Sequence, residues 1–202
     1  MQLGLEGKAV IVNGASQGIG LATARMFAEE GARVVVTARR TEGLERARAE
    51  VTKLARAEVV AVQGDIRKAE DCARIVERTL EAFGGVDVLI NNDGAPPLGE
   101  ALSFDDTAWS KAVEQNLMSV IRMTRGVVPS MRERGGGRIV NVAALSAIQP
   151  IPRFGLSVAT WAGVIGFSKT LSLEIAADGI TINTICPGMI DTPRLQKVTE
   201  QS

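Results

Sequence analysis

The order of apolar and polar positions predicts a chain that alternates between buried strands and helices. Short apolar runs rich in valine and isoleucine are typical of parallel strands that are buried on both faces. We expect strands at residues 9–12, 34–36, 59–62, 86–90, 138–142 and 180–186. Segments with a helical spacing of apolar residues lie between them, and the two longest cover residues 106–134 and 157–177. The chain after residue 188 is expected to be a short polar tail.

This alternation predicts the fold class. The chain contains no repeats, low-complexity tracts or linker, so we expect residues 1–202 to form a single dinucleotide-binding domain. The predicted fold is α/β, a doubly wound Rossmann fold whose parallel sheet of about six strands carries helices on both faces. Ligands of such sheets lie at the carboxyl ends of the strands. Chemistry is therefore expected in the segments that directly follow the strands.

The segment KAVIVNGASQGIG, residues 8–20, combines the first strand, a glycine-rich turn and the start of a helix. Gly14, Gly18 and Gly20 remove side chains where a backbone has to approach a ligand closely. The start of the helix offers free N–H groups and a partial positive charge, which suit a phosphate. The G-x-x-x-G-x-G spacing differs from the general G-x-G-x-x-G fingerprint, and a purely structural turn is the alternative.

Two charged residues follow the next strands. A Rossmann site for NAD carries an acid near the position of Arg39, whereas an arginine suits the additional 2′-phosphate of NADP. We favour this phosphate interpretation over that of a solvated basic loop, because the arginine stands at the carboxyl end of a predicted strand. Asp65 is expected to hold an adenine amino group, and the alternative is that it caps the helix that begins near residue 68.

Composition narrows the class of protein. Lys plus Arg and Asp plus Glu both number 23, and the resulting zero net charge argues against nucleic acid or an anionic membrane as a partner. No apolar run has the length of a membrane span, and the start of the chain lacks the apolar core of a signal peptide. Cys72 and Cys186 have no metal-type spacing. We therefore expect a cytoplasmic protein without a metal site.

The chain contains no histidine and no tyrosine. The absence of histidine excludes histidine-based triads and histidine–metal sites. Proton chemistry would have to use carboxylates, lysine, cysteine, hydroxyls, water or the substrate itself.

Six segments together resemble the short-chain dehydrogenase/reductase family over nearly all of the chain, with a likeness to 3-oxoacyl-carrier-protein reductases. They are NGASQGIG at 13–20, GDI at 64–66, NNDG at 91–94, RIVNV at 138–142, GVIGFSKTLSLEIA at 163–176 and CPGMIDTP at 186–193. The resemblance implies a nicotinamide cofactor, NADP(H) in preference to NAD(H). It also implies hydride transfer between this cofactor and a small-molecule carbonyl or alcohol substrate.

The resemblance also implies the residues of the cofactor site. Those of the glycine turn, for the pyrophosphate and adenosine side, are Gly14, Ser16, Gly18, Ile19 and Gly20, with Ser16 and Arg39 at the 2′-phosphate. Gln17 stands where many NADP-preferring relatives have a basic residue. The residues for adenine are Asp65 and Ile66, those for the nicotinamide-side ribose Asn92 and Gly94, and those for the carboxamide Pro187, Gly188, Ile190 and Thr192. Asp93 replaces the usual alanine and puts a negative charge near the cofactor.

The resemblance weakens at the catalytic residues. The family uses asparagine, serine, tyrosine and lysine, and only the asparagine is present, as Asn116 in EQNLMSV. The other three positions hold Ala144, Ser157 and Trp161. A serine without an activating base is a poor proton donor near pH 7, and tryptophan carries no positive charge. Asn116 and Ser157 are the candidate catalytic residues, and we expect an atypical or impaired proton relay.

Other residues offer substitutes, each with a simpler alternative. Ser146 is expected to reach a carbonyl oxygen or to be a loop serine that bonds backbone. Asp93 is expected to act as an acid if buried or to be a turn aspartate. Cys186 is expected to titrate near neutrality or to be an inert buried thiol. Trp161 is expected to fill the space of the missing lysine, with a cap on the nicotinamide as the alternative.

Two main functions follow from these residues. The first is an NADP(H)-dependent oxidoreductase, and the second is a catalytically inactive cofactor-binding relative with a regulatory or assembly role. A third interpretation is an altered or incompletely assigned chain of a normal reductase. The family usually continues with a lid and a last strand, and the given chain stops before them, at Ser202. A chain that is part of a longer protein is the alternative explanation. Because the family pairs through its two long helices, we expect a homo-oligomer, a dimer or a tetramer.

Overall fold

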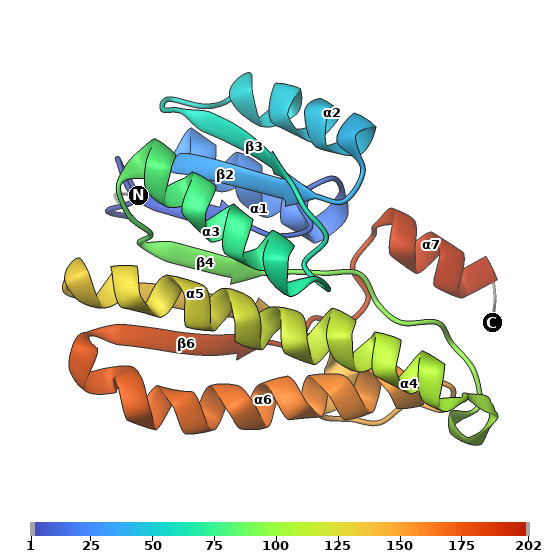
Figure 1. Ribbon diagram of the computed structural model, residues 1–202. Coiled ribbons are helices and arrows are strands. Elements are labelled where there is room, and N and C mark those ends of the chain that lie inside the picture. The colour runs from blue at the N-terminus through green and yellow to red at the C-terminus, as the bar shows by residue number, and fades with distance from the viewer. Residues whose placement is uncertain (1–2, 201–202) are drawn as a thin grey trace.

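Six parallel strands form one sheet in the order β3-β2-β1-β4-β5-β6 (Figure 1). The computed structural model describes residues 3–200. The strands are β1 (Ala9–Val12), β2 (Arg33–Ala38), β3 (Val59–Gln63), β4 (Val88–Asn91), β5 (Gly137–Val142) and β6 (Ile180–Ile185). The strand order reverses between β1 and β4, which is the ligand-binding switch point of a Rossmann fold. The predicted α/β fold class is confirmed.

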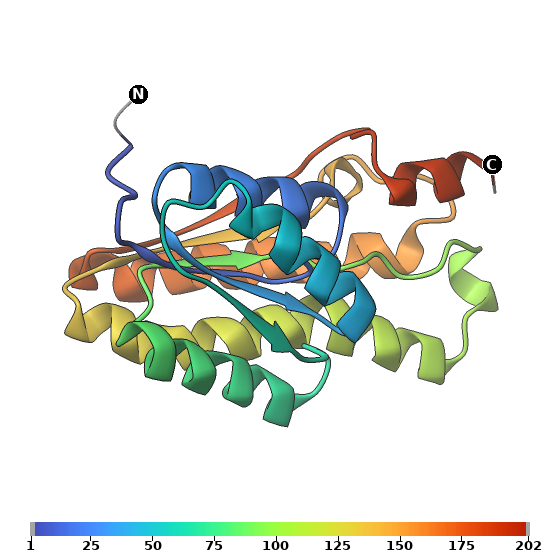
Figure 2. The same ribbon diagram turned by 90° about the horizontal axis from the view of Figure 1, so that it is seen from above.

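Helices cover both faces of this sheet (Figure 2). They are α1 (Gly18–Glu29), α2 (Thr41–Thr52), α3 (Ala69–Phe83), α4 (Asp106–Ala112), α5 (Ser119–Glu133), α6 (Gly155–Ile175) and α7 (Pro193–Glu200). Short 3₁₀ turns occur at η1 (Ala101–Ser103), η3 (Leu145–Ala147) and η4 (Ala176–Asp178). Of the helices in residues 3–200, none has the length and hydropathy that crossing a membrane would require.

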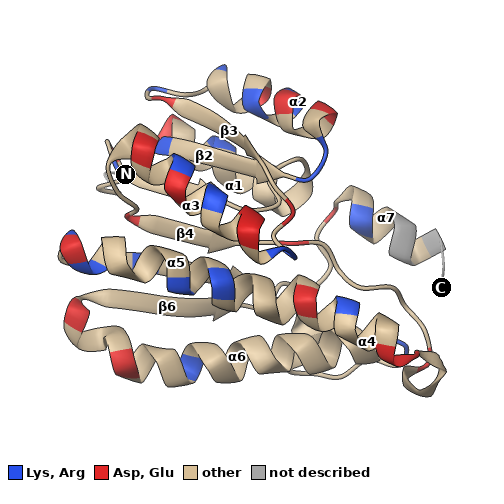
Figure 3. Cartoon of the chain, in the orientation of Figure 1, with Lys and Arg blue, Asp and Glu red and all other residues tan. Residues whose placement is uncertain are grey.

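Strands β1 to β5 contribute to two apolar cores because their side chains alternate between the faces of the sheet, whereas β6 contributes Ile180 and Ile182 to one core. In β1, Ala9 and Ile11 pack with residues of α3 and α5, whereas Val10 and Val12 pack with residues of α1 and α2. All four residues of β1 are fully buried. Charged residues lie mainly on the helices, and the strands contain almost none (Figure 3). This burial on both faces explains why continuous apolar runs identify the strands.

The long helical region predicted over residues 106–134 is not one regular α-helix. A π-helical segment, η2 (Val113–Met118), separates α4 from α5. Such segments are rare and occur frequently at functional sites. Asn116, the candidate catalytic asparagine, lies within η2 and is buried.

The predicted polar tail is wrong, because the chain forms α7 after β6. Proline is favoured in the first position of a helix, which is where Pro193 stands. The Thr192 hydroxyl accepts a hydrogen bond from the backbone N–H of Leu195 at 3.3 Å, and the Arg194 guanidinium donates to the carbonyl of Pro96 at 3.0 Å. These contacts hold α7 beyond the carboxyl ends of the strands (Figure 1).

Candidate cofactor site and active site

The glycine turn after β1 is packed against the segment that follows β4. A Cβ atom on Gly14 would lie 2.4 Å from the Asn92 carbonyl oxygen, and one on Gly20 would lie 2.4 Å from the Gly14 carbonyl oxygen. The Asn92 side-chain amide donates to the carbonyls of Asn13 and Gly14 at 3.3 and 3.2 Å. Gly14 also has a φ of +62°, which favours glycine. Gly14 and Gly20 are therefore required for the turn itself, whatever it binds.

The start of α1 is suited to an anion. Among the described residues, no side chain caps the helix at Gln17, and the first turn contains no acidic residue. The first N–H groups of a helix lack partners within the helix and carry the positive end of its dipole. Gly18 has a φ of +58°, and a Cβ at this position would lie 3.2 Å from the Thr192 methyl group, so Thr192 approaches the start of α1 closely. A phosphate group fits these donors.

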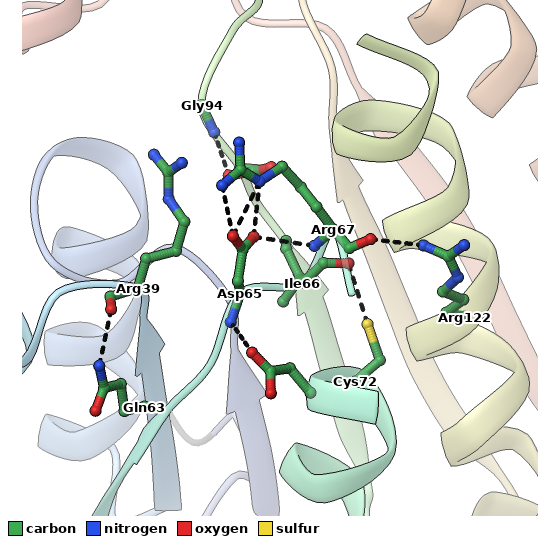
Figure 4. Close-up of polar contacts among 10 residues, drawn as sticks. Arg39, Gln63, Asp65, Ile66, Arg67, Cys72, Gly94 and Arg122 are labelled. Atoms are coloured by element: carbon green, nitrogen blue, oxygen red, sulfur yellow. Dashed lines mark hydrogen bonds and ion pairs between the residues drawn. The ribbon is translucent and has the colours of Figure 1, made fainter. Parts of the chain in front are cut away.

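Arg39 and Asp65 lie at neighbouring strand ends, as predicted (Figure 4). Arg39 is exposed, and its carbonyl accepts a hydrogen bond from the Gln63 amide at 3.1 Å. The Arg39 guanidinium forms no ion pair within residues 3–200, so it is available to a ligand. Ser16 lies close to the start of α2, because a Cβ on Gly43 would be 3.4 Å from the Ser16 Cβ.

Arg67 is a neighbour of the site that the sequence did not reveal. Its guanidinium Nε donates to the Asp65 Oδ1 at 2.8 Å and its Nη2 to the Oδ2 (Figure 4). This hydrogen bonding from Arg67 holds the pKa of Asp65 below its usual value. The N-cap position of α3 is Lys68 and no side chain of the described residues caps it, so the alternative that Asp65 caps α3 is wrong. The sequence contains no spacing pattern from which this contact between two loop residues could be predicted.

Asp93 is half-buried beside these charges. Its Oδ1 accepts a hydrogen bond from the backbone N–H of Gly94 at 2.6 Å, as in a turn aspartate. Desolvation raises the pKa of the Asp93 carboxyl to about 6, although the Gly94 N–H and the charge of Arg39 favour its ionised form. Asp93 therefore changes charge within a range of pH in which cofactor binding is measured.

We expect the free energy of unfolding to fall as the pH rises from about 4 to about 6.5, through Asp93. In this window the unfolded chain has already released the proton that the folded chain still holds, because the folded-state pKa of about 6 exceeds the usual value of 3.8. The contribution is at most about 3 kcal/mol. Urea unfolding at a series of pH values measures it, and Asp93→Asn should remove this part of the slope.

Asp87 provides the control for this titration. Burial opposes the charge of Asp87, but hydrogen bonds from the Ala9 N–H and Arg134 lower its pKa below the usual value of 3.8. The stability it contributes is present above that value and is lost only at lower pH. Asp87→Asn should leave the slope between pH 4 and 6.5 unchanged. An equal change of slope in both variants would contradict the assignment to Asp93.

A chain of buried side-chain hydrogen bonds crosses the carboxyl half of the sheet. The Thr37 hydroxyl donates to Asn13, the Asn13 amide to Asn91 and the Asn91 amide to Asn141, at 3.0, 3.2 and 2.8 Å. The Asn141 amide donates to the Ser168 hydroxyl on α6 at 2.8 Å. These residues, which we call the asparagine ladder, connect the ends of β2, β1, β4 and β5 and so fix the platform on which the site rests.

The candidate catalytic residues lie between η2 and α6. The Asn116 amide donates to the Thr160 hydroxyl at 2.8 Å, and Thr160 donates to the Leu156 carbonyl at 2.8 Å. Within the described part of the chain the Asn116 Oδ1 is buried and has no hydrogen-bond partner. Ser157 is only 1% exposed. Asn116 thus retains one unused acceptor, whereas Ser157 is withdrawn from solvent.

Trp161 stands one helical turn after Ser157 and lines a small cavity with Asp93 and Asn116. Val142 and Val164 add to an apolar wall on one part of the cavity, whereas Asn91, Asn141 and Ser119 make other parts polar. This placement agrees with the interpretation that Trp161 fills space by packing.

Ser146 and Cys186 are the two remaining substitutes. The Ser146 hydroxyl is buried and, among residues 3–200, has no hydrogen-bond partner, so the alternative of a loop serine that bonds backbone is wrong. Burial raises the pKa of the Cys186 thiol, which keeps it protonated at neutral pH.

The residues predicted for the nicotinamide end lie in the segment after β6. The Pro187 carbonyl accepts a hydrogen bond from the Leu145 N–H at 2.9 Å, which ties this segment to η3. Gly188 and Ile190 are exposed. The Thr192 hydroxyl accepts a hydrogen bond from the backbone N–H of Leu195 at the start of α7.

Comparison with known proteins identifies relatives over most of the chain. The family model for short chain dehydrogenases matches residues 8–202. A protein of Streptomyces coelicolor described as "Putative ketoacyl reductase" is 40% identical over 197 residues, which are 96% of this chain and 75% of that protein. Dehydrogenase/reductase SDR family member 4 of Oryctolagus cuniculus is 36% identical over 192 residues, 93% of this chain and 72% of that protein.

Solved structures agree with this relationship. L-Sorbose reductase from Gluconobacter frateurii, complexed with NADPH and L-sorbose, superposes with a TM-score of 0.96 at 37% identity, covering 100% of this chain and 76% of that one. A single-substitution variant of actinorhodin polyketide ketoreductase with NADPH superposes with a TM-score of 0.91 at 39% identity, covering 96% of this chain and 75% of that one. Both hold NADPH, the cofactor predicted from the sequence. The chain belongs to the short-chain dehydrogenase/reductase family.

Proposed function

We propose that this protein is an NADP(H)-dependent oxidoreductase that interconverts a carbonyl and an alcohol, with a ketoreductase-like specificity related to that of 3-oxoacyl-carrier-protein reductases. The observation that carries the proposal is the uncapped start of α1 together with the Arg39 guanidinium, which forms no ion pair among the described residues. Together they offer donors for a pyrophosphate and for an additional phosphate. The NADPH complexes among the solved relatives support the same cofactor.

The residues present fit this cofactor. We assign the phosphates to the turn residues Gly14, Ser16, Gln17, Gly18, Ile19 and Gly20, and the 2′-phosphate to Ser16 and Arg39. Asp65 and Ile66 would lie at the adenine, Asn92 and Gly94 at the ribose, and Pro187, Gly188, Ile190 and Thr192 at the nicotinamide. When bound, NADP(H) supplies or accepts the hydride. The chain supplies orientation, because the asparagine ladder and the Asn92 amide fix the turn and the strand ends.

Arg39→Ala should weaken NADP⁺ binding by about 10- to 100-fold and leave NAD⁺ binding nearly unchanged. A hydrogen bond to a charged group contributes about 1.5–3 kcal/mol, and 1.4 kcal/mol corresponds to a factor of ten. Calorimetric titration of both nucleotides measures the two dissociation constants. Arg46→Ala is the matched control, because Arg46 lies on α2 and pairs with Glu42 at the surface. Equal losses for both nucleotides would contradict the assignment of Arg39.

The proton relay is the second part of the proposal. We assign Asn116 and Ser157 to it, and we expect slow turnover. A general acid or base is typically worth about 10²–10⁴ in rate, and a well-placed hydride donor still benefits from proximity. The burial of Ser157 and the apolar wall at Trp161 favour, as the second candidate function, a cofactor-binding protein with a regulatory or assembly role. NADPH oxidation above the rate without substrate, across a panel of carbonyls, supports the oxidoreductase, and binding without turnover supports the alternative.

We also propose that the chain forms a homo-oligomer through its long helices. Gly166 of α6 is exposed with open space around it, which allows a second helix to approach closely. Gly163 does not offer such space, since a Cβ there would lie 3.3 Å from Leu117 of the same chain. Both cysteines are free, which suits the cytoplasm that we propose as its compartment.

A further inference from the structure

The Asp65 carboxylate, which is expected to hold the adenine amino group, is fully used by one neighbouring residue. Its Oδ1 accepts hydrogen bonds from the Arg67 backbone N–H at 3.2 Å and from the Arg67 Nε at 2.8 Å. Its Oδ2 accepts from the Arg67 Nη2 and, at 3.1 Å, from the same Nε. An ionised carboxylate offers about four lone-pair positions to hydrogen-bond donors. These contacts therefore leave no acceptor on Asp65 for the amino group of an adenine.

The backbone around this pair is held from both sides (Figure 4). The Asp65 N–H donates to the Asp71 carboxylate at 2.8 Å, and Asp71 forms an ion pair with Arg74 at 2.8 Å. The Arg67 carbonyl accepts a hydrogen bond from the Arg122 guanidinium at 2.9 Å. The position of Asp65 at the end of β3 therefore does not depend on the Arg67 side chain alone.

The Arg67 side chain, in contrast, is able to turn away from Asp65. It is 38% exposed, and within residues 3–200 its guanidinium has no hydrogen-bond or ion-pair partner other than Asp65. The guanidinium lies above the Asp65 carboxylate, on the side toward Gly94 (Figure 4). An ion pair with this degree of exposure contributes little to stability, so it can be broken without unfolding the loop.

An adenine amino group has to displace the guanidinium to reach the carboxylate. Hydrogen bonds between two charged groups are stronger than a bond from a neutral amino group to the same carboxylate. The favourable free energy of the new bond is therefore largely offset by the loss of the bonds from Arg67.

We infer that Arg67 determines the affinity for the adenine half of the cofactor, because its guanidinium and the adenine amino group compete for the Asp65 carboxylate. When the cofactor binds, the amino group takes the place of the guanidinium, which turns toward solvent. This inference rests on the proposed function, which assigns Asp65 to the adenine. It makes Arg67 a specificity-determining residue for the base of the nucleotide.

The test compares NADP⁺ with nicotinamide hypoxanthine dinucleotide phosphate, which carries a carbonyl oxygen in place of the adenine amino group. Both nucleotides have the same phosphates, so the ratio of their dissociation constants reports on the base alone. Calorimetric titration gives both constants. In Arg67→Met the preference for NADP⁺ over this analogue should rise about threefold to tenfold, as expected for one additional hydrogen bond to a partly exposed carboxylate.

Two further variants connect this effect to the carboxylate. In an Asp65→Ala background, Arg67→Met should leave the preference unchanged, because there is no acceptor to compete for. Arg78→Met is the control for the loss of one positive charge, since Arg78 lies on α3 and pairs with Glu81 at the surface. It should leave the preference at the value of the unsubstituted chain.

A direct contact between Arg67 and the cofactor would have a different result, because Arg67→Met would then weaken the binding of both nucleotides equally. If Arg67→Met leaves the preference unchanged or lowers it, the inference is overturned. An equal rise in the Asp65→Ala background also overturns it. Absence of NADP⁺ binding to the unsubstituted chain overturns the proposed function instead.

Discussion

The combined substitution Ala144→Ser, Ser157→Tyr and Trp161→Lys should raise the rate of NADPH-dependent carbonyl reduction by about 10²–10⁴. A phenol beside an ammonium group titrates closer to neutral pH than a serine hydroxyl, because the positive charge favours the phenolate. The lysine also replaces the apolar face that Trp161 presents to the cavity. NADPH oxidation with a panel of carbonyl substrates measures the effect.

The three substitutions have to be made together. Ser157 is only 1% exposed, so Ser157→Tyr alone forces a large ring into a packed site and should destabilise the fold. Trp161→Lys removes the neighbouring indole and provides the space. The control is the same triple variant with Ser157→Phe, which keeps the ring and lacks the proton. If the phenylalanine and tyrosine variants turn over equally fast, the missing proton donor is not what limits this chain.

Asn141→Leu should lower the free energy of unfolding by about 3 kcal/mol. The substitution keeps the volume but removes the acceptor of the Asn91 amide and the donor to the Ser168 hydroxyl, both of which are buried. A buried polar group that loses its partner costs about 1–3 kcal/mol. In a domain of this size the midpoint of thermal unfolding should fall by roughly 6–12 °C.

Asn183→Leu is the matched control for the asparagine ladder. Asn183 lies on the neighbouring strand β6, and its side chain is exposed. We expect it to change the midpoint by no more than about 2 °C, because exposed substitutions usually remain within about 0.5 kcal/mol. Similar losses in the two variants would mean that the effect comes from strand propensity and not from the ladder.

β1, β2 and β4 were predictable as continuous apolar runs because both of their faces are buried, whereas β5 and β6 alternate buried with more exposed residues. In β1 this produces the run AVIV, whose bounds agree with the prediction. The ends of helices could be predicted less well than the strands. α7 was missed because its eight residues contain too few apolar positions to show a helical period. The π-helical turn η2 has no periodic signature at all, although it places Asn116.

The site was predictable as a location and less so as a set of contacts. Arg39, Asp65 and Asn92 all follow strand ends, so the rule for parallel sheets placed them at one edge. The hydrogen-bond partners of these residues could not be predicted from the sequence, because they depend on the strand order and on the paths of the loops. Asn91 and Asn141 are 50 positions apart in the chain and become neighbours only once β4 and β5 are paired. The bond between Arg67 and Asp65 depends on the path of one loop.

The asparagine ladder has a consequence for how this protein acquires new specificities. It holds the ends of β2, β1, β4 and β5, on which the proposed dinucleotide site rests, in fixed positions relative to one another. These strands therefore have little freedom to adapt to a different substrate. Adaptation is left to the loop residues 95–99 and 143–152, which contribute no side chain to the ladder. Exchanging these two segments between homologues should therefore redirect substrate choice while the nucleotide affinity stays as it was.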